Sequence, residues 1–141
     1  MKFLIPVDGS EGANRAVDYV INSAAWLREP AHIYLLNVQW KLAMGNVKLF
    51  ISQATMDDYY REQGLAQLAA ARAKLDGAQL AYEYHISVGA PAAAIVQYAD
   101  AHKIDQIVMC KQGETSLQSM LLGSVASQVV QLAKCPVWML P

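Results

Sequence analysis

The stretch best suited to chemistry is residues 109–124, a loop with two glycines between an apolar run and a run with helical periodicity. Ile104 to Met109 predicts a strand and Val125 to Ala133 predicts a helix. Gly113 can adopt a positive φ angle at little cost, and Gly123-Ser124 falls where the helix should begin. The first amides of a helix have no partner inside it and suit an anion such as phosphate. The local pattern is a weak signal and leaves two interpretations open, a phosphate site or an ordinary strand-to-helix loop with a serine N-cap.

A second polar cluster, Asp8-Gly9-Ser10, follows the apolar run Phe3 to Val7. Ser10 is a candidate N-cap for the next helix, and Asp8 is either a site residue or a turn former. A phosphoacceptor role for Asp8, as in response-regulator receivers, is disfavoured. That role needs neighbouring acidic residues and a lysine at the fifth strand, whereas Asp8 has no acidic neighbour pair and Lys134 comes before that strand.

The cysteines and histidines give no metal motif. Cys110 is either a redox thiol, whose pKa a nearby helix N-terminus would lower, or a buried packing residue, and we expect the packing role. The three histidines His32, His85 and His102 are scattered singly, so we expect them to pack on strands or lie at the surface.

Composition limits the class of protein. The 141 residues suit one domain, 1–141, and 55% hydrophobic residues can supply its core. The net charge of -1 comes without a basic cluster, so no nucleic-acid partner is expected, and no apolar run is long enough for a membrane span. Two distant cysteines do not make a disulfide framework, which favours the cytoplasm.

Strand-like and helix-like segments alternate along the chain. Strands are predicted at Phe3–Val7, Ala31–Val38, Leu80–Val88, Ile104–Met109 and Val137–Leu140, and helices after Ser10, over Thr55–Asp76, from Pro91 and over Val125–Ala133. The long helix is expected to open with Asp57 and Asp58 and to stop at Gly77, and Gln39 to Ala54 is expected to form a loop with a short helical piece. This alternation predicts an α/β fold, a five-stranded parallel sheet with helices on both faces.

Ligands in such sheets bind beyond the carboxyl ends of the strands. Asp8, Val38 and the 109–124 loop all follow predicted strand ends. We therefore expect these three segments to converge on one crevice.

Five short motifs, taken together and in order, resemble the universal stress protein family over the whole chain. They are Ile5-Pro-Val-Asp-Gly-Ser10, Leu35-Leu-Asn-Val38, Val88-Gly-Ala-Pro91, Leu121-Leu-Gly-Ser-Val125 and Cys135-Pro-Val137. The resemblance implies the strand order 3-2-1-4-5 and a fold of the adenine-nucleotide α-hydrolase-like type.

Many members of that family bind ATP through a glycine, two residues, a second glycine, nine residues, and then a glycine followed by Ser or Thr. Gly113, Gly123 and Ser124 match the later part of this pattern, and Cys110 stands in place of the first glycine. Glu114 also places a carboxylate in the loop, which Lys111 offsets in part.

The resemblance implies which residues would contact each part of a bound ATP. Pro6, Val7 and Asp8 would line the adenine and ribose side, with Asp8 accepting from a ribose hydroxyl or helping a metal, and the Val38 backbone would meet adenine. The loop from Cys110 to Ser116, with Lys111 and Gly113, would wrap ribose and phosphates. Ser124 beside Gly123, with the amides of Val125 and Ala126, would hold the terminal phosphates, and Mg²⁺ would bridge phosphate oxygens.

No catalytic residue is predicted, because the motif contains no general base and no arginine, and any ATP hydrolysis is expected to be very slow. The last strand, Val137–Leu140, is an apolar edge that invites pairing. The resemblance implies a homodimer through this strand, unless Gln39 to Ala54 covers the edge.

The sequence thus predicts a cytoplasmic, ATP-binding homodimer acting in stress response or signalling. The competing hypothesis is a nucleotide-free dimeric interaction protein with a degenerate ATP site, favoured by Cys110 and Glu114.

Overall fold

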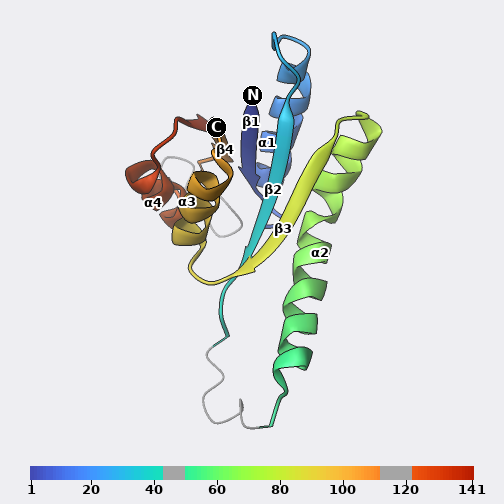
Figure 1. Cartoon of the computed structure of the whole chain (residues 1–141), viewed down its shortest axis with the longest axis vertical. Helices are drawn as coiled ribbons and strands as arrows, with labels where there is room; N and C mark the ends of the chain where they lie inside the picture. The colour runs from blue at the N-terminus through green and yellow to red at the C-terminus, as the bar shows by residue number, and fades with distance from the viewer. Residues whose placement is uncertain (43–49, 112–121) are drawn as a thin grey trace.

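The computed structural model describes residues 1–42, 50–111 and 122–141, and within these ranges strands and helices alternate (Figure 1). The elements are β1 (Lys2–Pro6), α1 (Glu11–Ala24), β2 (His32–Gln39), α2 (Gln53–Gly77), β3 (Tyr82–Val88), α3 (Pro91–His102), β4 (Gln106–Cys110), α4 (Ser124–Leu132) and β5 (Val137–Leu140). The strands form a parallel sheet in the order β3-β2-β1-β4-β5. The predicted fold class and strand order are therefore confirmed.

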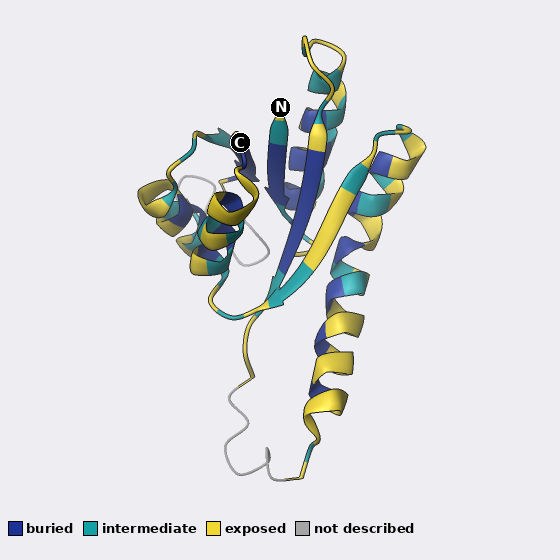
Figure 2. Ribbon diagram, viewed as in Figure 1, coloured by how far each residue is buried: buried dark blue, intermediate teal, exposed yellow. Residues whose placement is uncertain are grey.

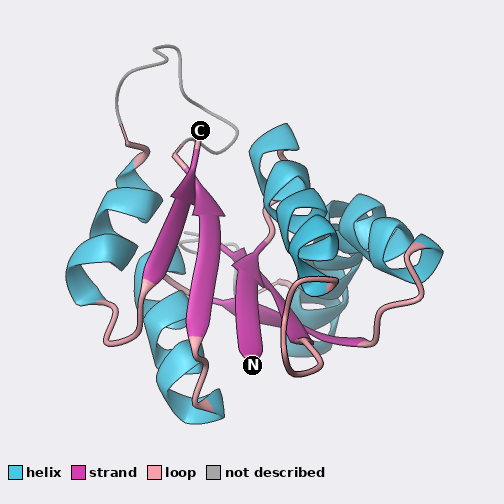
Figure 3. Cartoon of the chain, turned by 90° about the horizontal axis from the view of Figure 1, so that it is seen from above, coloured by secondary structure: helices cyan, strands magenta, loops and turns pink. Residues whose placement is uncertain are grey.

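Helices cover both faces of the sheet (Figure 3). One core lies beneath α1 and α2 and contains Ile5, Leu35 and Val108. The other lies beneath α3 and α4 and contains Leu4 and Ile107. Neighbouring strand residues thus serve opposite cores, which explains why the central strands read as continuous apolar runs.

Burial follows strand position (Figure 2). β1 and β2 are buried along most of their length, whereas β3 at one edge is largely exposed. The N-terminal half of α2 projects past the carboxyl ends of β2 and β3 (Figure 1). This projection adds a side wall beyond the end of the sheet.

The boundaries of the long helix differ from the prediction. α2 begins at Gln53, because the Ser52 hydroxyl caps it by accepting from the Thr55 amide at 3.1 Å. Asp57 and Asp58 therefore lie beyond the first turn, so their expected role at the helix start was wrong. Gly77 is the last helical residue rather than the stop, since Ala78 is the C-cap.

Other helix starts agree with the sequence. The Ser10 hydroxyl accepts from the Ala13 amide at 3.2 Å and caps α1. Pro91 is the first residue of α3, where its missing N–H costs nothing. The predicted strand at Ile104–Met109 is shifted to Gln106–Cys110, because the Ile104 amide bonds the Ala99 carbonyl and ends α3 instead.

The segment from Gln39 to Ala54 includes residues 43–49, so its predicted short helical piece lies largely outside the described residues. Its described beginning lies near β3 and α2. Gln39 pairs with Val88, and the Leu42 amide donates to the Tyr60 hydroxyl at 2.9 Å. That places this part of the segment at the edge of the sheet opposite β5. None of the described helices combines the length and apolar character needed to cross a bilayer.

Candidate functional site

A cavity of about 480 Å³ opens at the carboxyl ends of β1, β2 and β4. It brings together most of the predicted site residues, which are Pro6, Val7, Asp8, Val38, Cys110, Gly123, Ser124, Val125 and Ala126. Lys111 follows Cys110 without being among the lining residues, and Gly113, Glu114 and Ser116 lie outside the described residues. The expected convergence of strand ends on one crevice is therefore present in the fold.

Asp8 forms the turn between β1 and α1 and also lines the cavity. Its Oδ1 accepts from the Ser10 amide at 3.0 Å, and Gly9 takes a φ of 86°. Asp8 therefore does form the turn, and this turn holds its carboxylate on the wall of the cavity. The second oxygen, Oδ2, has no hydrogen-bond partner among the described residues.

The start of α4 differs from the starts of α1 and α2, because no side chain caps it. Gly123 is the N-cap, with φ -58° and ψ 156°, and its carbonyl accepts from the Ser127 amide at 2.9 Å. The amides of Ser124, Val125 and Ala126 therefore lack partners inside the helix. These three residues line the cavity, so its wall carries donors suited to an anion.

Lys111 connects this helix start to the last strand. Its carbonyl accepts from the Gly123 amide at 2.6 Å, and its amide donates to the Leu140 carbonyl at 2.9 Å. The two ends of the 111–123 connection are thereby held together beside the end of β5.

Cys110 is buried, and its thiol faces α1. The Sγ donates to the Gly12 carbonyl at 2.8 Å, and the residue is only 7% exposed. Burial raises the pKa of Cys110, although the nearby Arg15 guanidinium opposes the shift. The expected packing role fits the observed contacts, and the raised pKa disfavours the alternative of a reactive redox thiol.

We expect Cys110 to react with iodoacetamide at pH 8 more than about tenfold more slowly in the native protein than in urea, because the thiolate is the reactive form and burial disfavours it. Peptide mass spectrometry separates Cys110 from Cys135, whose pKa burial also raises. Equal native and unfolded rates at Cys110 would contradict its burial.

Because both folded thiol pKa values are raised, the free energy of unfolding should also fall as the pH rises above about 8.5.

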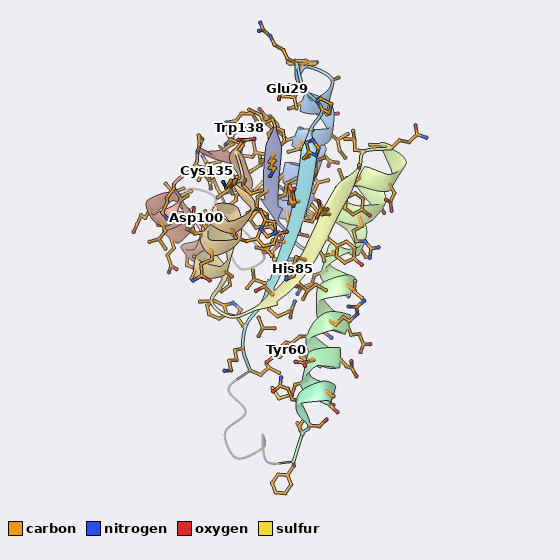
Figure 4. All side chains as sticks on the ribbon, viewed as in Figure 1. Glu29, Tyr60, His85, Asp100, Cys135 and Trp138 are labelled. Atoms are coloured by element: carbon orange, nitrogen blue, oxygen red, sulfur yellow. The ribbon has the colours of Figure 1, made fainter. Side chains whose placement is uncertain are left out.

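Sequence reasoning missed the wall of the cavity that α2 provides. Tyr59, Tyr60 and Gln67 of α2 line the cavity, and Trp40 and Leu42 from the chain after β2 line it beside them. Tyr60 lies in the projecting half of α2 (Figure 4), and its hydroxyl fixes the chain after β2 through the Leu42 amide. The adjacent tyrosines Tyr59 and Tyr60 indicate no site by themselves, because the angle between α2 and the sheet cannot be inferred from the sequence.

A buried amide side chain supports the β1 end of the cavity. Asn37 is 0% exposed, and its Nδ2 donates to the Val7 carbonyl at 2.8 Å and to Gln67 Oε1 at 2.7 Å. Its Oδ1 accepts from Gln39 Nε2 at 2.7 Å. Asn37 therefore ties β1, β2 and α2 together directly under the lining residues.

The remaining polar candidates lie elsewhere. His102 stacks on Tyr98 with ring centroids 3.8 Å apart, and His85 lies 5.8 Å from the same ring. Lys134 pairs with Asp100 at 2.7 Å on the surface. Over the residues that the structure describes, no three His, Cys, Asp or Glu side chains gather to hold a metal ion.

Comparison with protein families and curated proteins gives one consistent result. The model of the universal stress protein family matches residues 1–141. Universal stress protein MJ0531 of Methanocaldococcus jannaschii is 33% identical over 138 residues, which cover 96% of this chain and 79% of that protein. Universal stress protein YxiE of Bacillus subtilis is 28% identical over 143 residues, which cover 96% and 95%.

Solved structures with a similar fold cover nearly the whole chain. Hypothetical protein MJ0577 superposes with a TM-score of 0.82 at 27% identity, covering 99% of this chain and 94% of that one. Universal stress protein UspA from Lactobacillus plantarum gives 0.75 at 27%, with 100% and 97% covered. A universal stress protein in complex with cAMP gives 0.73 at 25%, again with 100% and 97% covered.

Proposed function

Because the chain belongs to the universal stress protein family, we propose that it binds an adenine nucleotide, with ATP as the ligand, in the cavity beside α4. The observation that carries the proposal is the uncapped start of α4, whose first amides lie on the same cavity as Asp8 and Val38. The cavity volume falls within the range of small-molecule sites. A relative with 25% identity was solved in complex with cAMP, an adenine nucleotide.

The described residues supply the groups that a nucleotide needs. Val38 would meet the base through its backbone, Asp8 would accept from a ribose hydroxyl or help a metal, and the amides of residues 124–126 would hold the terminal phosphates. A Mg²⁺ ion would come with the nucleotide and offset part of the phosphate charge, and Asp8 is the residue that would help hold it. Cys110 is compatible with this arrangement because its thiol is turned to the Gly12 carbonyl.

We place the protein in the cytoplasm, acting in stress response or signalling through binding rather than turnover. Lys111 offers a route for the signal. It bonds Gly123 at the start of α4 and Leu140 at the end of β5. A ligand that shifts Gly123 would therefore act on the strand proposed for dimer contact.

The thermal unfolding of the protein with and without Mg-ATP tests the proposal. At one hundred times the dissociation constant, a ligand adds about 2.7 kcal/mol to the free energy of unfolding. Mg-cytidine triphosphate is a control with the same charge and a different base. An unchanged melting temperature at millimolar Mg-ATP would contradict nucleotide binding.

One observation favours the competing hypothesis of a nucleotide-free interaction protein. The Gly123 amide already donates to the Lys111 carbonyl, so one donor of the α4 start is used within the chain. The amides of Ser124, Val125 and Ala126 still lack partners inside the helix, so we favour nucleotide binding. A missing thermal shift would leave the interaction protein as the better account.

We further propose a homodimer through β5. This strand has β4 on one side and lies at the end of the sheet order, and no other strand of the described residues pairs with its outer edge. Trp138, labelled in Figure 4, packs this strand against β1 and α1. Its ring centroid lies 6.0 Å from that of Phe3 on β1 and 5.7 Å from that of Tyr19 on α1.

Replacing Met139 by lysine should convert the dimer into monomers, because paired edges would bring two charges together. Light scattering should then give a mass near 15.5 kDa instead of twice that value. Val88→Lys is the matched control, since Val88 is a partly exposed apolar residue on β3, the opposite edge strand. A Met139→Lys protein that is folded by circular dichroism and still dimeric would contradict the β5 interface.

A further inference from the structure

Three amide side chains form a network where β2 meets α2. Asn37 Nδ2 donates to Gln67 Oε1 at 2.7 Å, and Gln39 Nε2 donates to the same oxygen at 2.9 Å. Gln39 Nε2 also donates to Asn37 Oδ1 at 2.7 Å. Gln39 and Gln67 both line the cavity, whereas Asn37 is buried beneath them.

The Val7 carbonyl fixes the direction of every bond in this network. A carbonyl only accepts, so Asn37 must present Nδ2 to it, at 2.8 Å. The second Asn37 N–H then requires the oxygen of Gln67, and Asn37 Oδ1 requires the nitrogen of Gln39. A flipped amide at any of the three positions would set two donors or two acceptors against each other.

With these directions fixed, one donor and one acceptor of the network are not used within it. Gln67 Nε2 and Gln39 Oε1 have no hydrogen-bond partner among the described residues, and both belong to side chains on the cavity. Gln67 is also held from behind, because its side chain packs on Gly9, where an added Cβ would lie 3.3 Å from Gln67 Cγ. The donor and the acceptor are therefore held in place before any ligand arrives.

We propose that this pair reads the edge of the adenine base that carries N6 and N7. Gln67 Nε2 donates to N7, and Gln39 Oε1 accepts from the N6 amine. Adenine presents one donor and one acceptor along this edge, whereas guanine and hypoxanthine present acceptors at both N7 and O6. Trp40 and Tyr59 also line the cavity, and their aromatic rings offer flat faces to a base. The inference rests on the proposed nucleotide binding and gives its base specificity.

The first test uses the wild-type protein, so it does not depend on any variant folding. Dissociation constants are measured for Mg complexes of ATP, 7-deaza-ATP and inosine triphosphate. Loss of the N7 bond should weaken 7-deaza-ATP about fivefold. Inosine triphosphate should bind at least about tenfold more weakly, because its O6 faces Gln39 Oε1. Binding of both analogues within twofold of ATP would overturn the inference.

The second test changes the protein. Gln67→Glu keeps an oxygen to accept from Asn37 and Gln39 and replaces the remaining donor with an acceptor. In this variant 7-deaza-ATP should bind at least as tightly as ATP, because the carboxylate opposes N7. Gln63→Glu is the matched control, since Gln63 is exposed one turn earlier on α2 and is not among the described lining residues.

The Gln63→Glu protein should retain the wild-type preference for ATP over 7-deaza-ATP, which separates the base contact from the effect of charge on the phosphates. A Gln67→Glu protein that keeps this preference would overturn the inference alone, with nucleotide binding intact. A wild-type protein that binds none of the three nucleotides would instead contradict the proposed function and, with it, the inference.

Discussion

Replacing Gly123 by aspartate is expected to weaken Mg-ATP binding by about 100-fold while leaving the protein at least as stable as the wild type. Gly123 has φ -58°, which any residue can adopt, and it holds the N-cap position of α4. Aspartate there would accept from first-turn amides that have no partner inside the helix, and it would place a carboxylate where the phosphates are proposed to lie. Hydrogen bonds to charged groups are worth about 1.5–3 kcal/mol each, and about 1.4 kcal/mol corresponds to tenfold in affinity.

The opposite signs of the two effects make this prediction specific. A capping aspartate usually stabilises a helix relative to glycine by a few tenths of a kcal/mol, and its charge favours the helix N-terminus. Gly123→Asn is the matched control, because it adds a similar cap without the charge, and it should weaken Mg-ATP less. Calorimetry measures the binding and thermal melts measure the stability. A well-folded Gly123→Asp protein that binds Mg-ATP with wild-type affinity would contradict the placement of the phosphates at the start of α4.

The second large effect is expected at Asn37. Replacing it by aspartate should lower the free energy of unfolding at pH 7 by about 3–5 kcal/mol, although the two side chains have nearly the same shape. The side chain is 0% exposed, and its Nδ2 faces the Val7 carbonyl and Gln67 Oε1. One oxygen of a carboxylate in its place would face these two acceptors without a proton to donate, while the other oxygen would keep the donor of Gln39.

The pH dependence identifies the cause of this loss. Burial and opposed oxygens raise the pKa of a carboxyl, so the penalty is absent below the pKa of the unfolded carboxyl, about 3.9, and grows as the pH rises above it. Urea unfolding of the variant at pH 7 and pH 5 should show the larger deficit at pH 7. Gln63→Glu adds the same charge at an exposed position and should change stability little. A deficit below about 1 kcal/mol at pH 7 would contradict the amide network.

The sheet and the crevice could be predicted from the sequence because they depend on local patterns. Apolar runs located the strands, and strand ends of parallel sheets share one edge, so Asp8 and Val38 were expected together and lie on one cavity. The start of α2 was missed despite a local signal. Ser52 is an N-cap residue type, but the weakly patterned segment before it obscured its role.

The direction of the Cys110 side chain depends on strand register. Val108 packs in the core under α1, and residues two apart on a strand share a face, so Cys110 points to the same side. Alternation alone could have suggested this, whereas the carbonyl that the thiol meets could not be foreseen. The pairing of Gln67 with Asn37 was beyond sequence reasoning, because it joins residues 30 apart through the packing of α2.

The most direct measurement is a titration of the ¹⁵N-labelled protein with Mg-ATP, followed by the backbone amide resonances. The account predicts saturable shifts, one nucleotide per chain, at Ser124, Val125 and Ala126, with matching shifts around Asp8 and Val38. Resonances of α4 that stay fixed while the ligand saturates other residues, or that stay fixed throughout, would contradict it.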